Sequence, residues 1–228
     1  MKPLLITIAV ALAVSGIACN ASPPDAHAHP AGTTAAAASG DSATATASTP
    51  AAPNLQAALR GLWHGHVVET RNYALAVKAG DTDAAGRAEQ DVIANATEIS
   101  DAVASFYGAA AGEKMLGLLG GHWGGVKALT GANHRGDAAG AQQALGDLVA
   151  NAGEIATFLA GANPNLPADA VRGLLVAHGG HHAAQTQQIM AGDMAAEAQT
   201  WTAMQAHMDV IADALAGAIA KQFPDKAS

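Results

Sequence analysis

The sequence contains ten histidines, almost as many as its eleven Lys and Arg residues together, and three of the histidines recur at a fixed interval. His66, His122 and His178 are separated by 56 residues and then by 56 again. Histidine is the commonest metal ligand in proteins, and three converging imidazoles with an open fourth position suit Zn²⁺ or copper. These three residues are therefore the first candidates for a metal site, provided that the fold brings them together.

A second interpretation needs no metal. Each of the three histidines lies in an apolar helical stripe, where a buried imidazole must have a hydrogen-bond partner, a water or a metal ion. Asn95 and Asn151 recur with the same spacing of 56, and His207 occupies the third equivalent position. These side chains could pair with the histidines across each hairpin as a polar clasp. The sequence leaves the metal site and the clasp open as alternatives.

Further histidines extend the metal hypothesis. His178 and His182 are four residues apart, which is a common geometry for two metal ligands on one helix, and His181 is three residues from His178. Surface exposure is the alternative for His181 and His182. His207 is a secondary candidate ligand as well as a member of the predicted clasp.

Carboxylates near the repeated residues are also candidates. Glu69 follows His66 by three residues, which places a carboxylate about one turn away, as in carboxylate-bridged bundle sites. A Glu-x-x-His pattern does not recur on two helices, so a ferritin-type di-iron centre is not expected. Glu98 and Glu154 follow the repeated asparagines by three residues and could either join the polar network or face water.

The spacing of 56 extends well beyond the histidines and predicts a triplicated unit. The other repeated columns are Leu62, Leu118 and Leu174; Gly80-Asp81, Gly136-Asp137 and Gly192-Asp193; and Ile99, Ile155 and Ile211. In each unit an apolar helical stripe precedes the Gly-Asp pair and another follows it. Glycine suits the end of a helix and aspartate the N-cap of the next, so each unit is predicted to be an αα-hairpin.

The predicted fold is all-α, with three tandem hairpins forming a six-helix bundle. Half of the residues are hydrophobic but only 4% are aromatic, because alanine dominates, and this composition argues against an all-β fold. The helices are expected at about 57–79, 83–106, 111–133, 138–160, 168–190 and 195–221. Equivalent histidines would converge if the hairpins closed around a pseudo-threefold axis, but would lie apart if the hairpins stacked as a solenoid.

The N-terminal segment predicts the cellular compartment. Lys2 is followed by an apolar run from Leu4 to Val14, which suits a signal peptide over residues 1–18. The run ends in a segment that resembles a bacterial lipobox, in which Cys19 would be lipidated and anchor the chain to the membrane. An ordinary signal peptide is the alternative. Asn20 favours the outer membrane, and residues 19–53 have the Ala, Thr, Ser and Pro composition of a flexible tether before the bundle at 54–228.

Several short motifs are spread over residues 57–226. They are Leu62-Trp63 with His66-Val67, Tyr107-Gly108, Asn151-Ala152 with Glu154-Ile155, Asn163-Pro164, and the closing Gln222-Phe223-Pro224. Through these motifs the segment resembles a family of uncharacterised small bacterial helical proteins. Gly179-Gly180-His181-His182 departs from the family pattern. The resemblance implies a helical fold and brings no activity, cofactor or mechanism.

Composition and missing motifs narrow the functional classes. The net charge of −8 argues against a nucleic-acid partner. The sequence has no phosphate-binding loop and no Gly-x-Ser-x-Gly elbow, so enzymatic activity is the lesser hypothesis. The expected function is that of an envelope lipoprotein whose histidine-lined bundle binds, buffers or hands over Zn or Cu. The alternative is a non-catalytic helical interaction module in which the histidines are structural; the sequence names no protein partner.

Overall fold

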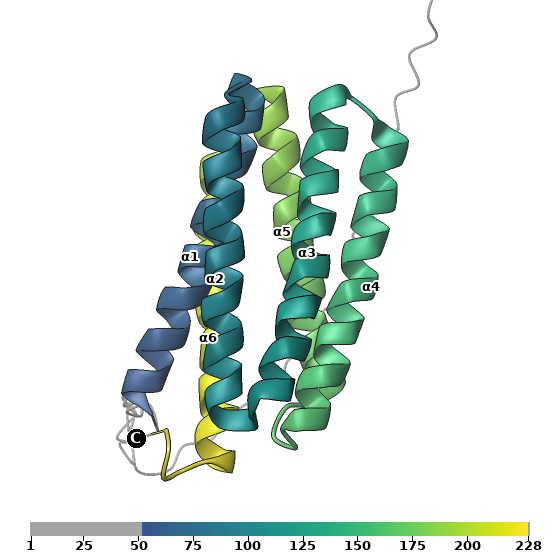
Figure 1. Cartoon of the computed structure of the whole chain (residues 1–228). Coiled ribbons are helices and arrows are strands. Elements are labelled where there is room, and N and C mark those ends of the chain that lie inside the picture. Colours follow the sequence, from purple (N-terminus) through teal and green to yellow (C-terminus); the bar gives the residue numbers. More distant parts are fainter. Residues whose placement is uncertain (1–51, 228) are drawn as a thin grey trace, which may run out of the picture. The chain divides into compact units, whose positions relative to one another are not determined.

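The computed structural model describes residues 52–227, which form six α-helices joined by short turns (Figure 1). The helices are α1 (Pro53–Ala79), α2 (Thr82–Tyr107), α3 (Ala109–Arg135), α4 (Ala138–Ala162), α5 (Ala168–Ala191) and α6 (Met194–Gln222). Among these residues every regular element is helical, and the prediction of an all-α six-helix bundle is confirmed. Across the described residues, none of the helices combines the length and hydrophobicity needed to span a bilayer.

The first helix begins earlier than predicted. Pro53 is its first residue, although the sequence placed residues 19–53 in the tether and the start of the helix near 57. Proline suits this position because its φ is already helical and the N–H that it lacks would have had no partner. Ala52 just before it is buried with Ala220 and Ala227. The predicted signal peptide, Cys19 and the remaining tether lie outside the described residues.

The Gly-Asp pairs form the turns within the three hairpins, as predicted. The glycines at these turns have φ between 69° and 78°, in the left-handed region that glycine adopts at little cost. Each aspartate that follows is an N-cap, and its carboxylate accepts a hydrogen bond from the backbone N–H three residues later. The turns are Gly80-Asp81, Gly136-Asp137 and Gly192-Asp193.

The three hairpins close into a ring. Helices α1, α3 and α5 contact one another on the inside. Helix α2 contacts α1 and α3, α4 contacts α3 and α5, and α6 contacts α5 and α1. Because α6 returns to α1, the hairpins surround an axis and do not form an open stack. Equivalent residues on the three inner helices therefore meet near this axis.

Glycines in α3 make room for α4. Helix α3 is continuous although it contains several glycines, which lower intrinsic helix propensity. A Cβ at Gly125 would lie 2.8 Å from Leu148 Cδ2, and one at Gly121 would lie 3.0 Å from Asn151 Nδ2. Both contacts are closer than packed atoms normally approach. These two glycines therefore allow the second hairpin to pack tightly.

Candidate metal centre

The repeated histidines meet at the centre of the bundle. His66 on α1, His122 on α3 and His178 on α5 are all buried. Their ring centroids are 5.6 Å apart for His66–His122, 5.8 Å for His66–His178 and 5.3 Å for His122–His178. The three imidazoles thus form a nearly equilateral triangle, with one member from each inner helix.

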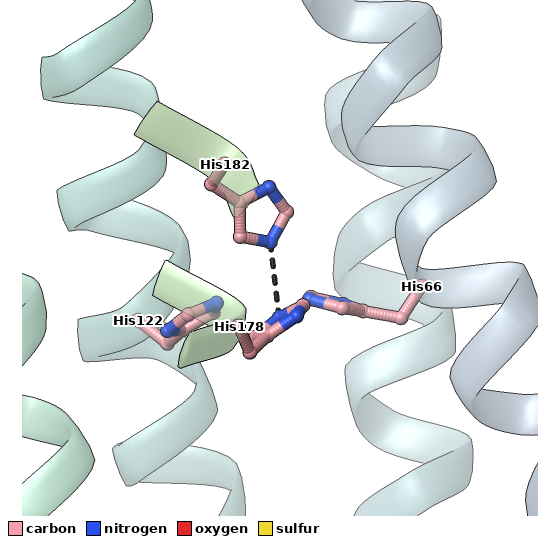
Figure 2. A group of neighbouring side chains, drawn as sticks. All are labelled: His66, His122, His178 and His182. Atoms are coloured by element: carbon pink, nitrogen blue, oxygen red, sulfur yellow. Dashed lines mark hydrogen bonds between the residues drawn. The ribbon is translucent and has the colours of Figure 1, made fainter. Parts of the chain in front are cut away.

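A fourth imidazole caps this triangle. His182 lies one turn after His178 on α5 and is only 1% exposed (Figure 2). Its ring centroid is 4.4 to 6.0 Å from the other three, and its Nε2 is 3.0 Å from His178 Nε2. Surface exposure, the alternative considered for His182 from the sequence, is therefore wrong: the residue lies in the same buried stripe as His178.

The spacing of the four rings is close to what one metal ion requires. One nitrogen from each imidazole can be chosen so that all four lie within 4.8 Å of one another. In a tetrahedral zinc site with Zn–N distances of about 2.1 Å, the nitrogens are about 3.4 Å apart. The pair at 3.0 Å is already at about this separation, and the others would have to approach by at most about 1.4 Å. We refer to His66, His122, His178 and His182 as the histidine cluster.

The histidine cluster is neutral at pH 7. Burial lowers the pKa of His66 from 6.5 to about 3, with a further contribution from His122, and burial lowers that of His122 to about 4. Burial also holds the pKa values of His178 and His182 well below 6.5, and the neighbouring imidazoles add to the effect. Neutral imidazole is the form that binds metal ions. At neutral pH the cluster therefore carries no positive charge that would repel a metal cation.

Several nitrogens of the cluster have no partner within the protein. They are both ring nitrogens of His66, Nε2 of His122 and Nδ1 of His178. A buried polar group without a partner costs about 1–3 kcal/mol, so native proteins seldom keep several of them together. A bound metal ion would engage one nitrogen from each ring and remove part of this cost.

The predicted polar clasp is wrong in its pairing. Asn95 and Asn151 do not bond to the histidines: their side-chain amides donate to the backbone carbonyls of Leu62 and Leu118, each at 3.0 Å. His207 Nε2 makes the equivalent contact to the carbonyl of Leu174 at 2.8 Å. In an α-helix, the carbonyl four residues before a residue accepts that residue's own N–H. The second helix of each hairpin is therefore tied to the backbone one turn before each repeated histidine.

The other predicted site residues lie outside the histidine cluster. Glu69 accepts a hydrogen bond from the side chain of Asn72 at the surface. Glu98 and Glu154 are exposed, so they do not belong to the buried polar contacts. His181 does not belong to the cluster and lies beside His207, with ring centroids 5.3 Å apart.

A buried ion pair near the cluster was not predicted. Glu197 at the start of α6 is 1% exposed and accepts two hydrogen bonds from Arg71, at 2.6 and 2.9 Å. Gln185, three residues after His182, donates to the same carboxylate at 3.0 Å. Glu197 stands in line with Trp201, Met204 and Met208 on the apolar side of α6. A carboxylate within such a stripe is the signal in the sequence that could have revealed the pair.

The fold and the cluster together define a helical module with four buried histidines that could hold a metal ion. Comparison with models of protein families, with characterised proteins and with solved structures finds no match to this chain. The resemblance to an uncharacterised helical family stays a prediction.

Proposed function

We propose that the protein binds one transition-metal ion at the histidine cluster and serves to store, buffer or hand over that metal in the bacterial envelope. The observation that carries the proposal is the convergence of four buried, neutral imidazoles whose nitrogens lie within 4.8 Å of one another. Four isolated buried histidines would each need a separate partner. A common metal ion explains their convergence from three different helices.

The donor set narrows the choice of metal. Nitrogen ligands suit Zn²⁺ and copper, whereas Mg²⁺ and Ca²⁺ prefer oxygen, which the cluster does not supply. No carboxylate belongs to the cluster to balance the charge of an ion. Since burying an unbalanced charge is costly, Cu⁺ carries an advantage over divalent ions. Zn²⁺ and copper are therefore the proposed metals, with Cu⁺ favoured by charge.

Storage or transfer fits the cluster better than hydrolysis. Catalytic zinc sites use three protein ligands and keep the fourth position for water, whereas structural sites fill all four positions with protein ligands. With His182 above the triangle, a tetrahedral ion would have no free position for a reacting water. This is the reason to propose binding and handover in place of a metal-assisted enzyme.

The envelope location rests on the N-terminal sequence. Lys2, the apolar run from Leu4 to Val14 and Cys19 favour a signal peptide followed by a lipid anchor. We place the protein on the periplasmic face, attached through Cys19, with the outer membrane favoured over the inner one. The acidic net charge gives no support for a nucleic-acid partner.

Calorimetric titration of the untagged protein with Zn²⁺, and a competition titration with Cu⁺, test the proposal. We expect one ion per chain, and a loss of affinity of at least about 100-fold, or about 2.7 kcal/mol, when His66, His122 or His178 is replaced by alanine. His134→Ala is the matched control, because His134 is exposed near the end of α3. His181→Ala and His207→Ala should have smaller effects than the cluster variants.

The opposite result is equally clear. If neither metal binds more tightly than about 10 μM, the metal function is wrong, and the histidines are structural parts of a helical interaction module. In that case each alanine variant should change only the free energy of unfolding, with no dependence on added metal.

A further inference from the structure

A small cavity adjoins the histidine cluster on the side away from His182. It has a volume of about 30 Å³ and is lined by the three repeated histidines together with apolar side chains of the inner and outer helices. Trp63, Leu119 and Leu175 are among the lining residues, and each stands three positions before a repeated histidine. The cavity therefore lies one turn toward the start of the inner helices.

His182 lies on the other side of the triangle. It follows His178 by four residues along α5 and does not line the cavity. The inner helices run in the same direction because the chain reverses once within each hairpin and once more between one hairpin and the next. Three histidines thus form a layer with a fourth ligand on one face and an apolar cavity on the other. Three ligands would come from this layer, and the fourth position of a tetrahedral ion could be filled either by His182 from one face or by a small molecule from the cavity on the other.

The lining of the cavity selects its occupant. Apart from the imidazoles and Trp63, the lining side chains are Leu, Ile, Val and Ala, which offer no hydrogen bonds to a water or an anion. The volume is about twice the minimum that holds one water molecule, which is enough for two bonded atoms. One of the lining residues, Trp63, has a buried indole N–H without an acceptor. A small uncharged molecule with a lone pair fits this environment.

The geometry points to a ligand-binding site of the bound metal: a neutral diatomic molecule such as CO enters the cavity and takes the place of His182 as the fourth ligand of an ion held by His66, His122 and His178. This inference rests on the proposed metal function. A second cavity of about 40 Å³ shares Trp63, Leu159, Leu166 and Leu215 with the first and continues to Phe106 and Tyr107 at the end of α2. The second cavity would give such a molecule an apolar approach toward the metal.

Carbon monoxide and Cu⁺ provide the direct test. The full-length protein is loaded with one Cu⁺ per chain, exposed to CO, and examined by infrared spectroscopy for the C–O stretching band. We expect one CO per copper. Leu175→Phe, which places extra atoms in the cavity, should keep the copper and lose the band. Leu145→Phe is the control, because Leu145 lies on α4 and lines neither cavity.

Xenon separates the cavity from the metal. The metal-free protein should bind xenon, as measured by ¹²⁹Xe chemical shift, and Leu175→Phe should abolish this binding. Leu119→Phe replaces Leu175→Phe if circular dichroism shows that the latter does not fold. Copper binding without a C–O band would overturn this inference and leave the proposed metal function standing. Failure to bind copper would overturn this inference, and failure to bind both copper and Zn²⁺ would overturn the proposed metal function as well, whatever xenon shows.

Discussion

The first two hairpins differ from the third at the position one turn after the repeated histidine. There, α1 has Thr70, α3 has Val126 and α5 has His182, and all three side chains are buried. The same packing position therefore accepts a hydroxyl, a methyl or an imidazole. Only the third hairpin uses it to add a fourth imidazole to the histidine cluster. The threefold repeat builds the triangle of histidines, and a departure from the repeat completes it.

The hairpins also differ in how their second helix is held. In the first two, Asn95 and Asn151 pass close to Gly65 and Gly121 to reach the backbone carbonyl. In the third, Ala177 replaces the glycine, and the longer side chain of His207 makes the equivalent hydrogen bond. The contact is kept although both residues have changed. The positioning of the helix backbone at the site is thus shared by all three hairpins.

The largest expected effect is the loss of stability of the metal-free protein in acid. All four imidazoles of the histidine cluster are buried, and the third hairpin contributes two of them. An imidazole has a pKa near 6.5 when unfolded, but burial lowers that of His66 to about 3 and that of His122 to about 4. The contribution of these imidazoles to stability is therefore fully present above pH 6.5. Below pH 6.5 the unfolded chain binds protons that the folded cluster does not bind, so the free energy of unfolding falls by about 1.4 kcal/mol per pH unit for each buried imidazole.

Urea denaturation between pH 7.5 and 5 measures this loss, which we expect to exceed about 3 kcal/mol. Glu197 contributes little to the change in stability between pH 7.5 and 5. Its pKa is lowered from 4.5, chiefly by its hydrogen bond from Arg71, so the stabilisation that it provides is lost only at lower pH. His182→Val should make the dependence on pH shallower, because one buried imidazole fewer resists protonation. A free energy of unfolding that is constant from pH 7.5 to 5 would contradict the buried, neutral state of the cluster.

The next largest effect is expected when His182 of the third hairpin is replaced by valine, the residue at the equivalent position of the second hairpin. His182→Val leaves only the triangle, so the affinity for Zn²⁺ should fall by about 100-fold, or about 2.7 kcal/mol. The metal-free variant should lose about 1–3 kcal/mol of stability, because His178 Nε2 loses its hydrogen-bond partner. Calorimetric titration and urea denaturation measure the two changes. Val126→Thr, which gives α3 the residue of α1, is the control and should leave the affinity within about threefold.

Much of the fold could be predicted because the repeat encodes it locally. Gly80 and Asp81 mark the end of one helix and the start of the next through backbone conformation and capping, and both features act within a few residues. Pro53 is the exception. It lies at the end of a Pro- and Ala-rich segment, so composition assigned it to the tether, whereas packing of Ala52 on the end of α6 extends the helix.

The site could be predicted only in part because it depends on closure of the ring. The spacing of His66, His122 and His178 identified the triangle, but contact of α6 with α1 was needed to bring the three residues together. His182 was recognisable from its helical spacing, although its burial was not. The hydrogen-bond partner of Asn95 could not be predicted, because every residue has a backbone carbonyl and the residue type does not show which one accepts the bond. The cavity beside Leu175 likewise arises only from the packing of several helices.

The smallest effect concerns the contact that all three hairpins share. His207→Asn alone should cost about 1 kcal/mol of stability, because the shorter amide must reach the carbonyl of Leu174 past the methyl group of Ala177. Ala177→Gly alone should cost about as much through lower helix propensity. Together they recreate the arrangement of the first two hairpins, so the double variant should be about 0.5–1.5 kcal/mol more stable than the sum of the single changes predicts.

Urea denaturation of the wild type, the two single variants and the double variant measures this coupling. Zn²⁺ affinity should stay within about threefold throughout, since neither residue belongs to the histidine cluster. Strictly additive costs would show that the glycine and the asparagine do not act as a pair, and a large loss of affinity would show that the tie positions the metal ligands directly.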